Sequence, residues 1–154
     1  MKICIVRHGA AEHGSVQDRG RSLTDRGFRQ ADGAGKWLAS QPLNNPRLIA
    51  SPFLRTQQTA AAIAGHLNIA VESSEQLIPE GQVQPLVDEL THETRDVILV
   101  SHLPLVGHLA ALLVDGQIYE QPWSPAEVWI LDGDVAAAGC MTVNGVWYPV
   151  LEGI

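Results

Sequence analysis

A chain of 154 residues, of which 45% are hydrophobic and 18% charged, can bury a substantial core, so we expect a single domain spanning residues 1–154. Its formal net charge of −7 argues against general nucleic-acid binding, which requires an excess of lysine and arginine. The charge is uneven, because residues 1–30 carry six lysines and arginines against three acidic residues, and this suggests a local site for an anion.

The first predicted elements alternate between strand and helix. Residues 2–7 are a short apolar run that predicts a buried strand, and a loop rich in glycine, arginine and serine follows over 9–23. Thr24 is typical of a helix N-cap and predicts a helix over 25–40. The next predicted elements are a strand over 47–51, a helix over 53–67 and a strand over 69–73.

The same alternation continues through a helix over 83–91, a strand over 95–101 and a helix over 103–114. The stretch 97–114 is as apolar as a membrane segment, but His102 and Pro104 divide it into a strand and a helix. The chain also begins without a secretory signal pattern. We therefore expect a soluble, cytoplasmic protein that does not bind membranes.

The last third of the sequence is rich in β-forming residues. Three segments, 127–132, 139–144 and 146–151, are separated by turns and predict antiparallel edge strands. Together with the preceding alternation, they predict a three-layer α/β/α fold with a mainly parallel central sheet. The two cysteines, Cys4 and Cys140, are far apart in sequence, and we expect both to be reduced core residues.

Chemically distinctive residues follow three of the predicted strands. The first strand ends at Arg7 and His8, the second is followed by Arg55 one turn into the next helix, and the strand over 95–101 is followed by His102. The carboxyl ends of parallel strands lie at one edge of the sheet, where ligands bind. The pattern therefore predicts that two arginines and two histidines converge there, in keeping with a local site for an anion.

Three sequence segments, "VRHG", "SPFLRTQQTA" and "LVSHLPLVG", resemble the signature segments of the histidine phosphatase superfamily, and "RSLTDRG" resembles the segment before its first helix. The resemblance runs in order from residue 1 to about residue 115. The short length and the segment "SHLPLVGHL" further resemble the SixA-like phosphohistidine phosphatases. This resemblance implies a phosphoglycerate mutase-like fold without a large cap. It also implies a cofactor-free phosphatase whose partner is a phosphorylated histidine-containing phosphotransfer protein.

The resemblance implies a role for each residue of the predicted site. His8 would be the nucleophile that forms a covalent phosphohistidine intermediate, and Arg7 and Arg55 would bind the phosphoryl oxygens. His102 would donate a hydrogen bond to the phosphoryl group as an imidazolium, although its pKa should be low when no anion is bound, because arginines surround it. Arg21 matches the position of a further phosphate-contacting arginine.

A carboxylic acid that protonates the leaving group is not evident from a motif. Glu80 and Glu75 are the candidates, with Asp18 less favoured. A small-molecule phosphomonoesterase or mutase of the same superfamily would need such an acid, with Glu80 the first choice, and a cap. A phosphohistidine phosphatase needs less help, because imidazole is a good leaving group. A non-catalytic phosphoprotein-binding module would need the arginines but not the nucleophilic imidazole.

The sequence assigns no function to His13, His66, His92 or His108. No HxH, HExxH or CxxC spacing occurs, so we predict that the protein has no metal site. We expect the protein to be a monomer.

Overall fold

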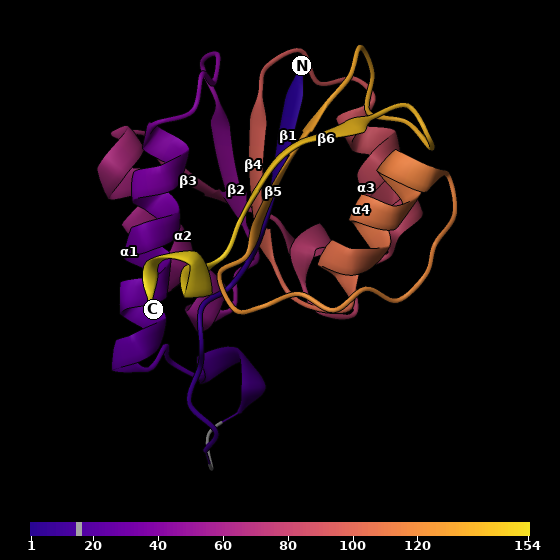
Figure 1. Cartoon of the computed structure of the whole chain (residues 1–154). Coiled ribbons are helices and arrows are strands. Elements are labelled where there is room, and N and C mark those ends of the chain that lie inside the picture. The colour runs from indigo at the N-terminus through magenta and orange to yellow at the C-terminus, as the bar shows by residue number, and fades with distance from the viewer. Residues whose placement is uncertain (15–16) are drawn as a thin grey trace.

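The computed structural model describes residues 1–14 and 17–154. A six-stranded sheet lies between two pairs of helices (Figure 1). The strands are β1 (Lys2–Arg7), β2 (Arg47–Ala50), β3 (Val71–Ser73), β4 (Val97–Ser101), β5 (Val128–Asp132) and β6 (Thr142–Trp147). The helices are α1 (Asp25–Ala39), α2 (Leu54–Leu67), α3 (Val83–Leu90) and α4 (Leu105–Asp115), with short 3-10 helices η1 (Asp18–Gly20), η2 (Glu75–Leu77) and η3 (Pro149–Glu152).

The strand order is β3-β2-β4-β1-β5-β6. The pairs β3–β2, β2–β4 and β4–β1 are parallel, whereas β5 is antiparallel to both β1 and β6. Helices α1 and α2 cover one face of the sheet, and α3 and α4 cover the other (Figure 1). The predicted three-layer fold with a mainly parallel sheet is confirmed.

Strand β1 contributes to a hydrophobic core on each face of the sheet. Ile3 and Ile5 pack with residues of α3 and α4, whereas Cys4 and Val6 pack with residues of α1 and α2. Side chains alternate between the two faces of a strand, so a strand that is covered on both faces must be apolar at every position. This arrangement accounts for the uninterrupted apolar run that precedes Arg7.

The chain leaves β1 along the start of α1, where two glycines permit close contact. A Cβ atom at Gly27 would lie 2.0 Å from the carbonyl oxygen of Ala10, and one at Gly9 would lie 2.6 Å from the carbonyl oxygen of Gly27. Thr24 caps the helix as predicted, because its Oγ1 accepts the N–H of Gly27 at 3.0 Å. The backbone around His8 is thereby held against the first turn of α1.

The predicted β-rich tail needs two corrections. The segments 139–144 and 146–151 are not separate strands, because the end of the first and the start of the second belong to the single strand β6, which ends at Trp147. Pro149, which has no N–H to donate to a sheet, begins η3 instead, and η3 packs against α1. Strand β5 is also not an edge strand, since it lies between β1 and β6.

The two cysteines differ in their surroundings. Cys4 is a buried, unbonded thiol as predicted, and burial raises its pKa. The prediction that Cys140 lies in the core is wrong, because this residue is exposed in the turn before β6. Cysteine is usually buried, but this turn keeps its residues at the surface.

The connections that follow β1 and β3 could hold a cap over the ends of the parallel strands. In their described parts the helical segments are η1 and η2, each three residues long. No large cap is therefore present in the described part of the chain. No described helix combines the length and apolar character needed to cross a membrane.

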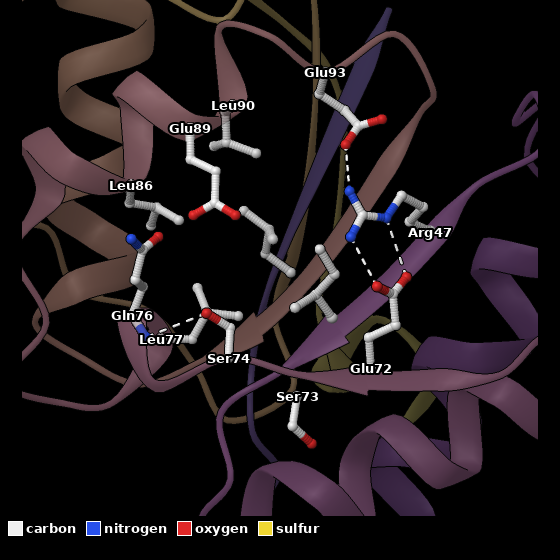
Figure 2. Close-up of a pocket in the computed structure, with 12 residues that line it drawn as sticks. Arg47, Glu72, Ser73, Ser74, Gln76, Leu77, Leu86, Glu89, Leu90 and Glu93 are labelled. Atoms are coloured by element: carbon white, nitrogen blue, oxygen red, sulfur yellow. Dashed lines mark hydrogen bonds and ion pairs between the residues drawn. The ribbon is translucent and has the colours of Figure 1, made fainter.

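On the face of the sheet that α3 covers, a hollow is lined by residues of β2, β3, β4, η2 and α3. Figure 2 shows the guanidinium group of Arg47, at the start of β2, between the carboxylates of Glu72 and Glu93. Arg47 donates to Glu72 through Nε at 3.0 Å and Nη2 at 2.7 Å, and to Glu93 through Nη1 at 2.5 Å. The two carboxylates raise the pKa of Arg47. These ion pairs link β2 to β3 and to the segment after α3.

Candidate active site

The ends of the parallel strands bring the two histidines of the predicted site together. Arg7 lies opposite Ser101 in the β1–β4 ladder, and the N–H of His8 donates to the carbonyl oxygen of Ser101 at 3.1 Å. His8 and His102, each the first residue after its strand, therefore face one another. Their ring centroids are 5.2 Å apart in an edge-to-face arrangement.

His8 is held as a neutral imidazole with one unprotonated ring nitrogen. Its Nδ1 lies 2.7 Å from the carbonyl oxygen of Gly9, which can only accept, so Nδ1 carries the proton and Nε2 does not. The Nε–H of Arg55 donates weakly to Nε2, at 3.3 Å. Burial lowers the pKa of His8 to about 4; the Gly9 carbonyl opposes this shift, and the charges of Arg55, Arg7 and Arg21 add to it. His8 is therefore unprotonated at Nε2 at neutral pH.

Arg55 connects α2 with the loop that follows β1. Its side chain extends from the first turn of α2 and the residue is only 4% exposed. Nη1 donates to the carbonyl oxygen of Asp18 at 2.7 Å, and Nη2 donates to the Asp18 carboxylate at 3.2 Å. The guanidinium carbon also lies 5.0 Å from the ring centroid of Phe53. These contacts hold the guanidinium beside His8.

Arg7, the last residue of β1, is held by a backbone carbonyl rather than by an acid. Its Nη1 donates to the carbonyl oxygen of Trp123 at 2.6 Å. Its Nε is buried and has no hydrogen-bond partner among residues 1–14 and 17–154. Burial lowers the pKa of Arg7, the negative charge of Glu127 opposes this, and the charge of Arg55 adds to it. A buried, unpaired guanidinium N–H is a donor that an anion can use.

The segment that supplies the Trp123 carbonyl is itself fixed by hydrogen bonds. The carboxylate of Glu127 accepts the N–H of Ser124 at 2.9 Å and the indole N–H of Trp129 at 2.7 Å. Ala126 is buried with a φ of 61°, an unfavourable conformation for alanine, and its N–H donates to the carbonyl oxygen of His8 at 3.0 Å. This segment therefore holds the backbone of His8 as well as the side chain of Arg7.

His102 lies between Ser51 and the ring of Phe53. Its Nε2 is 2.8 Å from Ser51 Oγ, and its ring centroid is 4.9 Å from that of Phe53. Ser51 Oγ accepts the N–H of Phe53 at 3.4 Å, and its own hydrogen can be donated to His102 Nε2. Nδ1, the other ring nitrogen of His102, is buried and has no partner in the described structure. Burial, followed by the neighbouring His8 and Arg55, lowers the pKa of His102 to about 2.

Arg21 joins the cluster through Asp18. Its Nε donates to the carbonyl oxygen of Glu12 at 2.7 Å, and its Nη1 donates to the Asp18 carboxylate at 2.9 Å. Arg19 lies at the margin, where it pairs with Glu75 at 3.2 Å and stacks over the ring of Phe53. The structure thus brings Arg21 to the same group as Arg7, His8, Arg55 and His102.

Of the three carboxylates considered as proton donors, one is paired with two arginines of the cluster and the other two make no contact with it in the described structure. The Asp18 pKa is lowered by its hydrogen bond with Arg21 and by Arg55, so this group is ionised at neutral pH and is not a general acid. Glu75 is paired with Arg19. Glu80 is exposed, and no hydrogen bond or ion pair joins it to any residue that the structure describes.

Two of the remaining histidines make contacts at the surface. His66 bonds Asp32 at 2.6 Å and His108 bonds Glu120 at 2.7 Å, whereas His13 and His92 are exposed. Within residues 1–14 and 17–154, no three histidine, cysteine or acidic side chains are grouped in a way that could hold a metal ion.

Sequence reasoning missed three contributors to the cluster. Ser51 belongs to the quoted motif, but its contact with His102 depends on β2 and β4 being neighbours. Trp123 acts through its backbone carbonyl, which leaves no signal in the sequence. The pairing of Asp18 with Arg21 could have been suspected, because the two residues are three positions apart and have opposite charges.

The chain is similar to known proteins in sequence and in fold. A family model described as histidine phosphatase superfamily (branch 1) matches residues 3–79. The chain is 36% identical over 125 residues to the phosphohistidine phosphatase SixA of Escherichia coli (strain K12), and the match covers 76% of each chain. It is 33% identical over 126 residues to a phosphohistidine phosphatase SixA homolog of Haemophilus influenzae, with 73% of this chain and 77% of the relative covered.

A solved structure of the protein histidine phosphatase SixA, complexed with tungstate, matches 99% of each chain with a TM-score of 0.87 and 31% sequence identity. A structure of an Agrobacterium tumefaciens protein matches with a TM-score of 0.79 at 16% identity, which is a likeness of fold alone. On the family model, the sequence relatives and the fold taken together, the chain belongs to the histidine phosphatase superfamily.

Proposed function

We propose that this protein is a phosphohistidine phosphatase that dephosphorylates a histidine-containing phosphotransfer protein through a covalent phosphohistidine intermediate on His8. The observation that carries the proposal is the state of His8: an imidazole with an unprotonated Nε2, fixed by the Gly9 carbonyl and surrounded by arginines. The similarity to SixA proteins supports the same activity.

In the first step, the lone pair of His8 Nε2 attacks phosphorus and forms a new P–N bond. The P–N bond of the substrate breaks at the same time. The substrate imidazole, which carries a proton on its other nitrogen, departs as a neutral ring. Because imidazole has an ordinary pKa of about 6.5, it departs far more readily than an alkoxide does. This step therefore needs no carboxylic acid, in keeping with the lack of a contact between Glu80 and the cluster.

In the second step, water attacks the phosphorus of the phosphorylated His8. The proton that the Gly9 carbonyl holds on Nδ1 makes His8 a neutral leaving group when the P–N bond breaks. The protons of the water stay on the released phosphate, so the enzyme returns to its starting protonation state. The same hydrogen bond thus prepares Nε2 for attack in the first step and for departure in the second.

The arginines supply the positive charge that the phosphoryl oxygens require in both steps. Arg7 offers its unpaired Nε–H, and Arg55 has one uncommitted N–H on each terminal nitrogen. When Ser51 Oγ–H donates to His102 Nε2, the neutral ring carries its proton on Nδ1 and can donate it to the phosphoryl group without first becoming an imidazolium. Donors that are already fixed in place stabilise the spread charge of a phosphoryl transition state with little reorganisation.

The lack of a large cap in the described structure favours a protein substrate. An uncovered site encloses little of a small metabolite, and so gains little remote binding energy from it. It can admit a phosphohistidine that projects from a folded domain, whose surroundings then provide further contacts. All of the site residues come from one chain, so we also propose that a monomer is active.

Parallel turnover assays test this function. We expect kcat/KM for a phosphorylated histidine-containing phosphotransfer domain to exceed that for sugar phosphates, phosphoglycerates and nucleotides by at least about 100-fold, or roughly 2.7 kcal/mol. The advantage should shrink at high salt, because part of it comes from screened charges. If a small phosphate ester is turned over equally well, the protein is instead a small-molecule phosphatase, and Glu80→Gln becomes the next variant to test.

A further inference from the structure

Asp18 occupies a position in the cluster that the proposed catalytic steps do not use. One carboxylate oxygen accepts from Arg21 Nη1 at 2.9 Å and the other from Arg55 Nη2 at 3.2 Å. Its backbone carbonyl also accepts from Arg55 Nη1 at 2.7 Å. A single residue of η1 therefore bridges two arginines whose charges both lower the pKa of His8.

From this bridge we infer that Asp18 is a positioning residue that acts as an internal counter-anion and competes with bound phosphate for Arg21 and Arg55. Without an anion, its charge offsets the repulsion between the two guanidinium groups and holds both beside His8. When phosphate binds, the carboxylate remains close to a second negative group that shares the same donors. Asp18 thus aligns the arginines but weakens their hold on the phosphate that the reaction releases.

Replacing Asp18 should change the affinity for an anion in opposite directions, depending on whether the residue competes with the anion or only maintains the loop. If Asp18 only maintained the loop, its replacement would loosen Arg21 and Arg55 and weaken the binding of an anion. If it competes, removing its charge strengthens that binding. Because the Asp18 side chain is 53% exposed, its charge is partly screened, and we expect an effect on the order of 10-fold rather than several orders of magnitude.

A matched control exists on α1. The carboxylate of Asp32 is 51% exposed and contacts two basic groups, His66 and Lys36, through its two oxygens. Its partner His66 is 11 residues after Arg55 on α2, which places it about 16 Å away along the helix. Asp32→Asn therefore makes the same change in net charge far from the proposed phosphoryl site.

The test is a calorimetric titration of each protein with inorganic phosphate at neutral pH. We expect Asp18→Asn to lower the Kd of phosphate about 10-fold relative to wild type, and Asp32→Asn to leave it within about 2-fold. Asp18→Glu, which keeps the charge, should restore an affinity close to that of wild type. The difference between Asp18→Asn and wild type should shrink at high salt.

An unchanged or raised Kd for Asp18→Asn overturns the inference, as does an equal gain in affinity for Asp32→Asn. Thermal melting identifies a variant that has not folded, in which case Asp18→Ser carries the same test. The inference rests on the proposed phosphoryl site, so a wild-type protein that does not bind phosphate would overturn it too. Binding is measured without turnover, so a wild-type protein that binds phosphate but does not hydrolyse phosphohistidine would overturn the proposed function alone.

Discussion

Arg47 and Arg55 lie at opposite ends of β2 and have opposite charge surroundings. Arg47, the first residue of the strand, lies between the carboxylates of Glu72 and Glu93 (Figure 2). Arg55, just beyond the end of the strand, shares the single carboxylate of Asp18 with Arg21. The first group therefore has an excess of negative charge and the second an excess of positive charge.

This difference in net charge indicates different roles. The ion pairs of Arg47 support the fold, whereas the group around Arg55 can bind an anion. The donors of Arg47 are directed at two acids, which would repel an incoming phosphoryl group. Burial depresses the pKa of His8, the charges of Arg55, Arg7 and Arg21 add to this shift, and a bound anion would offset those charges. The presence of an arginine is thus less informative than the balance of charge around it.

Of the changes considered, replacing His8 should have the largest effect on activity. His8→Ala removes the nucleophile but keeps the arginines, so we expect kcat/KM to fall by at least about 1,000-fold while the affinity for inorganic phosphate is largely retained. Steady-state assays and phosphate titration measure the two quantities. His66→Ala, which changes an exposed histidine on α2, should leave both unchanged. Substantial turnover by His8→Ala would contradict the assigned role.

A pair of arginine-to-lysine variants tests the two groups directly. Lysine keeps the charge but cannot form the planar fork, so Arg55→Lys should lower kcat/KM by about 100-fold. Arg47→Lys should leave kcat/KM within about 2-fold but lower Tm by about 2 °C, as expected for a partly exposed ion pair worth about 1 kcal/mol. Assays and thermal melts on both variants are needed. A larger loss of kcat/KM in Arg47→Lys than in Arg55→Lys would contradict the assignment of the two groups.

The pH dependence of turnover should reflect the depressed pKa of His8. Only the ring with an unprotonated Nε2 can attack, so activity is lost as the pH falls through the pKa of the free enzyme, which is about 4. We expect kcat/KM to stay level down to about pH 5 and to fall about 10-fold per pH unit below pH 4. The rates must be corrected for uncatalysed hydrolysis of the substrate. If activity instead fell as the pH dropped through about 6.5, burial and the arginines would not lower the pKa of His8 as described.

Treatment with a chelator should leave the activity unchanged. The positive charge that Mg²⁺ provides in other phosphoryl-transfer sites is assigned here to Arg7, Arg55, Arg21 and His102. Activity should therefore be equal before and after treatment with EDTA. Loss of activity that one divalent ion restores would contradict this assignment.

The sequence predicted the central part of the fold and the grouping of Arg7, His8, Arg55 and His102 for a common physical reason. Buried parallel strands are continuous apolar runs, and their carboxyl ends must meet at one edge of the sheet. Once the strands are located, the residues that follow them are brought together by topology alone. Strand ends that were correct to within two residues were sufficient for this.

The features that the sequence did not predict depend on loop conformation or on weaker local signals. The Trp123 carbonyl, the left-handed Ala126 and the Asp18 bridge are set by how two loops pack around the strand ends. In the tail, strong β-forming residues on both sides of Gly145 suggested two strands, yet they form one strand with an irregular register. Cys140 was predicted to be buried because cysteine usually is, but the exposure of a residue in a turn depends on the conformation of that turn.

Trapping the proposed covalent intermediate tests the central claim most directly. Rapid mixing with a histidine-phosphorylated protein carrying labelled phosphate, followed by quenching without acid, should leave label on the peptide that contains His8. The label should be stable to base and labile to acid, as expected for a phosphoramidate, and it should be absent from His8→Ala. Label on a serine or cysteine, or turnover of the substrate without any labelled enzyme at single-turnover concentrations, would contradict the account.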